Sequence, residues 1–66
     1  MKKILLRSVD EIIDALIEGR IIYPTNGTTR YWVYKGLVCM AEQDDDEAVP
    51  TINAHIDVNQ DFYYYG

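Results

Sequence analysis

The sequence predicts a single small α+β domain over residues 1–66, in which one N-terminal helix packs on a three-stranded antiparallel meander; a fourth strand is left open as an alternative. Two observations favour this class. An amphipathic stretch with a helix-capping pattern comes first, over residues 8–18. Two segments rich in β-forming residues follow it within residues 30–40, one on each side of Lys35-Gly36. Sixty-six residues allow one domain and only a modest core.

The helix is predicted over residues 9–18. Ser8 and Glu11 have the spacing of a capping box, in which each residue satisfies a free backbone amide of the other. Gly19 follows the last apolar position and can take the left-handed conformation that ends helices. Apolar residues recur at helical spacing on one stripe, namely Val9, Ile12, Ile13, Leu16 and Ile17.

Three strands are predicted after the helix, over residues 20–23, 29–34 and 37–42. The first should stop at Pro24, because proline cannot donate to a central ladder, and residues 24–27 should form a turn. Lys35-Gly36 is short enough for a tight hairpin loop. With two loop residues, the cross-strand neighbours are Tyr34 with Leu37, Val33 with Val38, Trp32 with Cys39 and Tyr31 with Met40.

Both faces of this hairpin are apolar. Alternation places Tyr31, Val33, Val38 and Met40 on one face, and Trp32, Tyr34, Leu37 and Cys39 on the other. One helix can cover only one face, so the second predicts a partner, most simply another copy of the chain. The sequence thus predicts a homodimer.

The remaining segments are less regular. Residues 43–60 show no clear period and are interpreted as a loop, whereas residues 62–65 regain β character and could add an edge strand or cross to a neighbouring subunit. Residues 2–6 are also a candidate for an extended segment, which would pair with that tail.

The net charge of −5 is unevenly distributed. Residues 1–40 hold six basic and four acidic side chains, and residues 41–66 hold seven acidic and no basic ones. Such a surface repels nucleic-acid backbones and favours a basic protein partner. The acidic loop Asp44, Asp45, Asp46 and Glu47 is interpreted as a solvated loop or a docking surface for such a partner, because its spacing does not match a calcium loop.

The sequence offers no catalytic or cofactor site. His55 and Asp57 lack a third ligand and a nucleophile, Cys39 is interpreted as a core residue, and no glycine-rich phosphate loop is present. We therefore predict a protein that is not an enzyme and binds no cofactor. The short apolar runs predict no membrane segment, and together with the lone cysteine they favour a cytoplasmic location.

The aromatic residues leave three alternatives open: core and self-association, another protein, or a planar ligand such as a nucleotide held between Tyr31 or Trp32 and the terminal tyrosines. For a dimer or partner interface the sequence nominates Tyr31, Trp32, Val33, Tyr34, Val38, Met40, Phe62 and Tyr64.

The order of a capped helix over residues 8–20, the run Ile21-Ile22-Tyr23 and the hairpin around residues 31–34 resembles small YopT-like proteins of Bacillus phages and prophages. This resemblance implies one helix with three strands per subunit and homodimerisation. The segment Ala15–Arg20 also resembles phage anti-defence domains that sequester nucleotide signals. The leading hypothesis is a non-enzymatic interaction protein of phage type that inhibits a host factor or defence protein; a small-molecule or nucleotide binder is the alternative.

Overall fold

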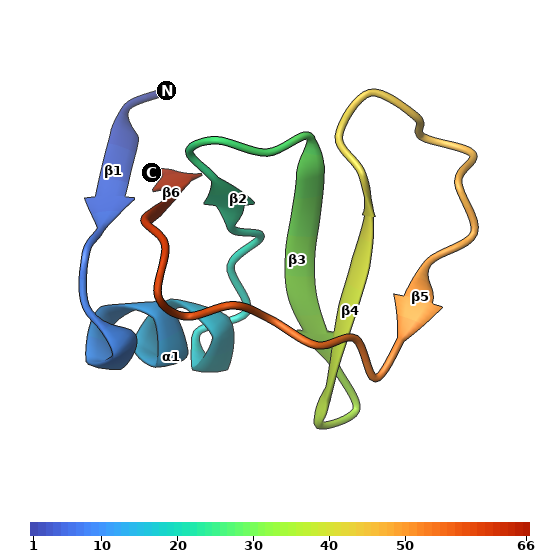
Figure 1. Ribbon diagram of the computed structural model, residues 1–66, viewed down its shortest axis with the longest axis horizontal. Coiled ribbons are helices and arrows are strands. Elements are labelled where there is room, and N and C mark those ends of the chain that lie inside the picture. Colours follow the sequence, from blue (N-terminus) through green and yellow to red (C-terminus); the bar gives the residue numbers. More distant parts are fainter.

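The protein combines one helix with two antiparallel three-stranded sheets, which confirms the predicted α+β class (Figure 1). The computed structural model describes residues 1–66. The first sheet has the strand order β1-β6-β2 and the second has the order β3-β4-β5, so the strands divide between two sheets rather than joining one meander as predicted. The elements are β1 (Lys3–Leu6), α1 (Val9–Ile17), β2 (Tyr23–Pro24), β3 (Thr29–Tyr34), β4 (Leu37–Glu42), β5 (Thr51–Ile52) and β6 (Phe62–Tyr65).

Helix α1 begins and ends with the caps that its sequence predicts. The Glu11 amide donates to Ser8 Oγ at 3.2 Å, and Glu11 Oε1 accepts from the Arg7 amide and from the Ser8 hydroxyl. The carboxylate thus reaches the amide of Arg7, one residue earlier than expected. At the other end Gly19 has φ +84°, and the Arg20 amide donates to the Ala15 carbonyl at 3.0 Å. This is a Schellman end, which satisfies carbonyls that the helix leaves free.

The buried stripe of α1 is narrower than its apolar pattern. Ile12, Ala15 and Leu16 are buried, but the predicted members Val9, Ile13 and Ile17 are exposed to between 43% and 77%. They lie along the flank of the buried stripe, which the sheets leave largely uncovered. Periodicity therefore identified the correct side of the helix and overestimated how much of it is covered.

The β3–β4 hairpin has the predicted bounds and register. Tyr34 pairs with Leu37, Val33 with Val38, Trp32 with Cys39 and Tyr31 with Met40. Lys35 and Gly36 both have positive φ, at 54° and 78°. Two positive φ angles are what a two-residue loop needs if its twist is to match the twist of the strands.

The first sheet joins the two ends of the chain. Strand β6 lies at its centre and pairs with β1 from Lys3↔Tyr65 to Leu6↔Phe62, so the predicted pairing of the two terminal segments is confirmed. The alternative that the tail is an edge strand is wrong, because β2 pairs with the other side of β6 through Tyr23↔Tyr63.

Strand β2 is shorter than predicted and includes the proline that was expected to end it. Ile22 exchanges two backbone hydrogen bonds of 2.8 Å with Tyr31, so its polar groups point towards β3, and those of Tyr23 point towards β6. Pro24 lies two residues after Ile22, so its backbone polar groups also point towards β3. The pairing with β3 stops at Ile22, however, so no group of β3 lies opposite Pro24 to accept a bond. The missing N–H therefore removes no ladder bond.

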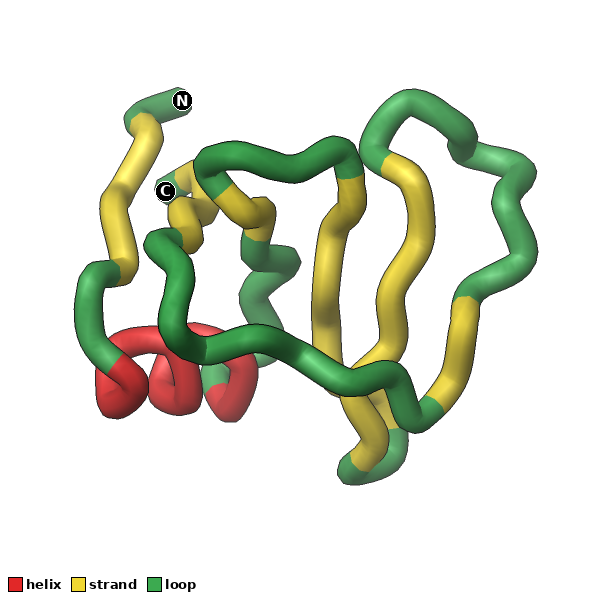
Figure 2. Tube along the Cα trace, viewed as in Figure 1, coloured by secondary structure: helices red, strands yellow, loops and turns green.

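The core lies where the helix meets both sheets. It consists of Leu6, Ile12, Ala15, Leu16, Ile22, Tyr31 and Phe62, and the paired backbones of Ile22 and Tyr31 join the two sheets beside it. The segment between β5 and β6 carries the chain back from the second sheet to the first (Figure 2), and its Ile56 packs against the core. The predicted loop over residues 43–60 therefore contains one short strand, β5, and a core contact.

Candidate functional site

The eight residues predicted for an interface occupy two different environments in the structure. Tyr31 and Phe62 belong to the core, where their rings meet edge to face with 5.8 Å between centroids. Val33, Val38, Met40 and Tyr64 pack against that core. Trp32 and Tyr34 alternate with Tyr31 and Val33 along β3 and therefore lie on the opposite face of the hairpin.

We call this opposite side of the second sheet the outer face; its exposed apolar members are Tyr34, Leu37 and Ile52. Their exposed fractions are 60%, 42% and 64%. Ile52 pairs with Cys39, and Cys39 pairs in turn with Trp32, so these three side chains share the outer face. Cys39 is buried between its larger neighbours, as expected for a small apolar residue.

The acidic loop follows β4 at the end of the hairpin opposite to Tyr34 and Leu37. Its four acidic residues, Asp44, Asp45, Asp46 and Glu47, are all exposed. The Glu47 amide donates to Asp45 Oδ1 at 3.0 Å, and the Gln43 side chain donates to the Thr29 carbonyl at 2.8 Å. The first bond lies within the loop and the second joins its start to β3, and none of the four carboxylates forms an ion pair.

A pocket of about 360 Å³ lies between the outer face and the acidic loop. Arg30 and Trp32 of β3 form one side, with the guanidinium carbon 5.6 Å from the centre of the indole. Asp46, Ala48 and Pro50 contribute from the loop, and Gly19 and Ile21 from the segment after the helix. The Nε atom of Arg30 is buried without a hydrogen-bond partner.

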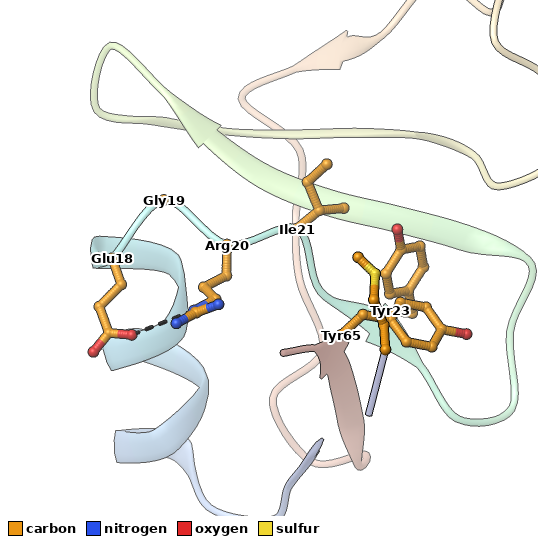
Figure 3. Close-up of a pocket in the computed structure, with 7 residues that line it drawn as sticks. Glu18, Gly19, Arg20, Ile21, Tyr23 and Tyr65 are labelled. Atoms are coloured by element: carbon orange, nitrogen blue, oxygen red, sulfur yellow. Dashed lines mark ion pairs between the residues drawn. The ribbon is translucent and has the colours of Figure 1, made fainter. Parts of the chain in front are cut away.

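A second pocket, of about 370 Å³, lies between the end of α1 and the first sheet (Figure 3). Glu18 and Arg20 form an ion pair of 3.5 Å on its helix side, and the rings of Tyr23 and Tyr65 lie 5.5 Å apart at its other end. Arg20 already has a carboxylate partner and lies over the Tyr64 ring, so its charge is not free for a ligand in this pocket.

The tyrosines of the first sheet stack mainly on one another. Tyr23 and Tyr63 are 5.3 Å apart with an interplanar angle of 22°, and the Lys3 ammonium lies 4.2 Å from the centre of the Tyr63 ring. Burial raises the pKa of Tyr63, and the neighbouring Tyr65 and Tyr23 add to that rise. The terminal tyrosines and Trp32 line different pockets, so they do not form the two sides of one ligand site. Tyr31 is buried and unavailable to a planar ligand.

The remaining polar candidates form no catalytic group. His55 and Asp57 are both exposed, and Asp57 accepts from the Asn59 amide at 3.0 Å in a local turn. No cluster of three or more His, Cys, Asp or Glu side chains has the arrangement that a metal ion needs.

Comparison with known proteins adds no relative. No family model matches the chain, and neither a curated protein nor a solved structure is significantly similar to it. The single helix is too short to cross a membrane.

The sequence-based prediction did not nominate Arg30 or four other residues that line the pocket beside Trp32, namely Gly19, Ile21, Ala48 and Pro50. Arg30 and Trp32 are two residues apart in a predicted strand, so their side chains are expected on the same face. This spacing was a usable signal for one side of the pocket. The other side depends on how residues 46–50 return towards β3, and no local pattern encodes that return.

Proposed function

We propose that this protein is a non-enzymatic interaction module that forms a homodimer and docks a basic protein through its acidic loop. The observation that carries the proposal is the position of the acidic loop at one end of an outer face with three exposed apolar side chains. Exposed apolar side chains are typical of protein interfaces, and a charged segment elsewhere on the same protein can orient an oppositely charged partner.

The outer face supports self-association. Tyr34, Leu37 and Ile52 are exposed in a chain too small to stabilise itself through a large core. A symmetric dimer would place the outer faces of two copies together and bury these side chains. Six of the eight residues in the predicted interface set already belong to the core or pack against it within one chain.

The acidic loop supports a basic partner. Four exposed carboxylates without cationic partners produce a concentrated negative potential that steers and orients a positively charged surface. A dense acidic surface can stand in for a phosphate backbone, so a nucleic-acid-binding host or defence protein is the favoured target.

The test compares two variants with the same change in net charge. Asp44→Asn, Asp45→Asn and Asp46→Asn together remove charge from the loop, while Asn at position 45 can still accept from the Glu47 amide. The control combines Asp14→Asn, Glu42→Gln and Asp61→Asn, whose exposed carboxylates make no hydrogen bond or ion pair.

Each protein is immobilised and exposed to a bacterial lysate at low and at moderate salt. We expect basic proteins to be enriched by the wild type and by the control, and lost by the loop variant or at moderate salt. Equal capture by both variants would contradict docking through the loop.

A further inference from the structure

The pocket between Arg30, Trp32 and Asp46 is lined by three different kinds of group. It holds about 360 Å³, which lies in the lower range for small-molecule sites. A cation, an anion and an indole line this cavity, and unlike Arg20 and Glu18 of the second pocket the two charges are not paired with each other.

Arg30 is the unsatisfied member of the group. Its Nε is buried without an acceptor, and its guanidinium forms no ion pair, although Asp46 lines the same pocket. A half-buried cation without a hydrogen-bond partner is unfavourable. A ligand in the pocket can reach the Nη atoms, which are not buried and donate to no group of the chain, and planar acceptors would suit them because arginine presents its donors as a flat fork.

Asp46 sets the second requirement. It is exposed and unpaired on the loop side of the pocket, so a ligand between it and Arg30 must present donors to a carboxylate and acceptors to a guanidinium. Trp32 sets the third requirement, since its indole offers a stacking surface to a planar ring.

We infer that this pocket binds a guanine base. Guanine carries the acceptors O6 and N7 on one edge, which suit arginine, and N–H donors on the adjacent edge, which suit a carboxylate. Adenine has an amino donor where guanine has O6, so in the same orientation it would turn a donor towards Arg30. The strongly acidic second half of the chain opposes phosphate groups, so the nucleoside or the free base is favoured over nucleotides. This inference does not depend on a protein partner.

The first experiment titrates the full-length protein with guanosine and adenosine, following Trp32 fluorescence and, independently, the heat of binding. Trp32 is the only tryptophan, so any fluorescence change reports on this pocket. We expect a Kd for guanosine on the order of 0.1 mM and binding of adenosine at least about tenfold weaker. Equal affinities, or no binding of guanosine up to about 1 mM, would overturn the inference.

The second experiment separates base recognition from general charge. Asp46→Asn should weaken guanosine binding about tenfold, because a neutral amide replaces the carboxylate that accepts from the base. Glu42→Gln removes the same charge from an exposed residue outside the pocket and should leave the affinity unchanged. If both variants bind like the wild type, or both weaken equally, Asp46 does not contact the base and the inference fails.

Discussion

At the scale of single residues, Phe62 has a different role from the one that the sequence predicted. The sequence nominated it for an interface, yet it is fully buried at the centre of the first sheet. Its neighbours across the ladders are Leu6 and Pro24, and Tyr31 of the second sheet meets its ring edge to face. It therefore contacts the elements on which both sheets depend.

Replacement of Phe62 by alanine should unfold the protein. Loss of a buried phenylalanine costs about 3–5 kcal/mol, which is comparable with the whole stability that a core of this size supplies. Urea denaturation followed by circular dichroism measures the loss. Val49→Ala is the control, because Val49 is 90% exposed and its truncation should change stability by less than about 0.5 kcal/mol. A folded Phe62→Ala protein with an unchanged midpoint would contradict this account of the core.

At the scale of elements, sequence signals that act over a few residues predicted the ends of the helix and the register of the hairpin. Ser8 and Gly19 mark the ends of α1, and Lys35-Gly36 sets a register that the whole hairpin follows. Each of these signals acts within a few residues of the structure it specifies.

Non-local pairing explains the elements that were missed or misplaced. The central position of β6 depends on β1 and β2, which come from the other half of the chain. Strand β5 has two residues and no periodic pattern of its own, so only its pairing with Cys39 and Met40 defines it. The pocket was missed for the same reason, since its two sides come from β3 and from a loop that follows β4.

The hairpin loop should accept a stabilising change at Lys35. Lysine is unfavourable at a φ of 54°, whereas asparagine tolerates this conformation, so Lys35→Asn should add a few tenths of a kcal/mol. Gly36→Ala should remove about 1 kcal/mol, because φ is 78° there, although no atom crowds the added Cβ. Thermal unfolding measures both changes as shifts of opposite sign. Shifts of the same sign would mean that the loop has another conformation.

At the scale of the whole molecule, the helix and the outer face occupy different sides of the second sheet. The inner face packs with the core, whereas the outer face keeps exposed apolar side chains near the hairpin loop, with the acidic loop and the Arg30 pocket towards the other end of β3 and β4. The sequence predicted two apolar faces correctly. Which face was covered within one chain could be decided only from the contacts of Val33 and Tyr31 with the core.

Single charges placed on adjacent residues of β3 should separate folding from assembly. Val33→Lys places a cation against the core and should unfold the chain. Tyr34→Lys changes a residue that is 60% exposed and should leave a folded protein that no longer dimerises. Sedimentation should show twice the chain mass for the wild type and the chain mass for Tyr34→Lys. A wild-type monomer at micromolar concentration would remove the support for the dimer.

The pairing of β1 with β6 also bears on how the chain folds. Lys2 and Gly66 exchange backbone hydrogen bonds of 3.2 and 2.8 Å, so the first sheet closes a loop that contains almost every other residue. Contacts of such long sequence separation slow folding, because most of the chain entropy must be lost before they form. During synthesis the helix and the hairpin can form early, but β1 has no partner until residues 62–65 have left the ribosome. The first sheet is therefore completed only when β6 has been made.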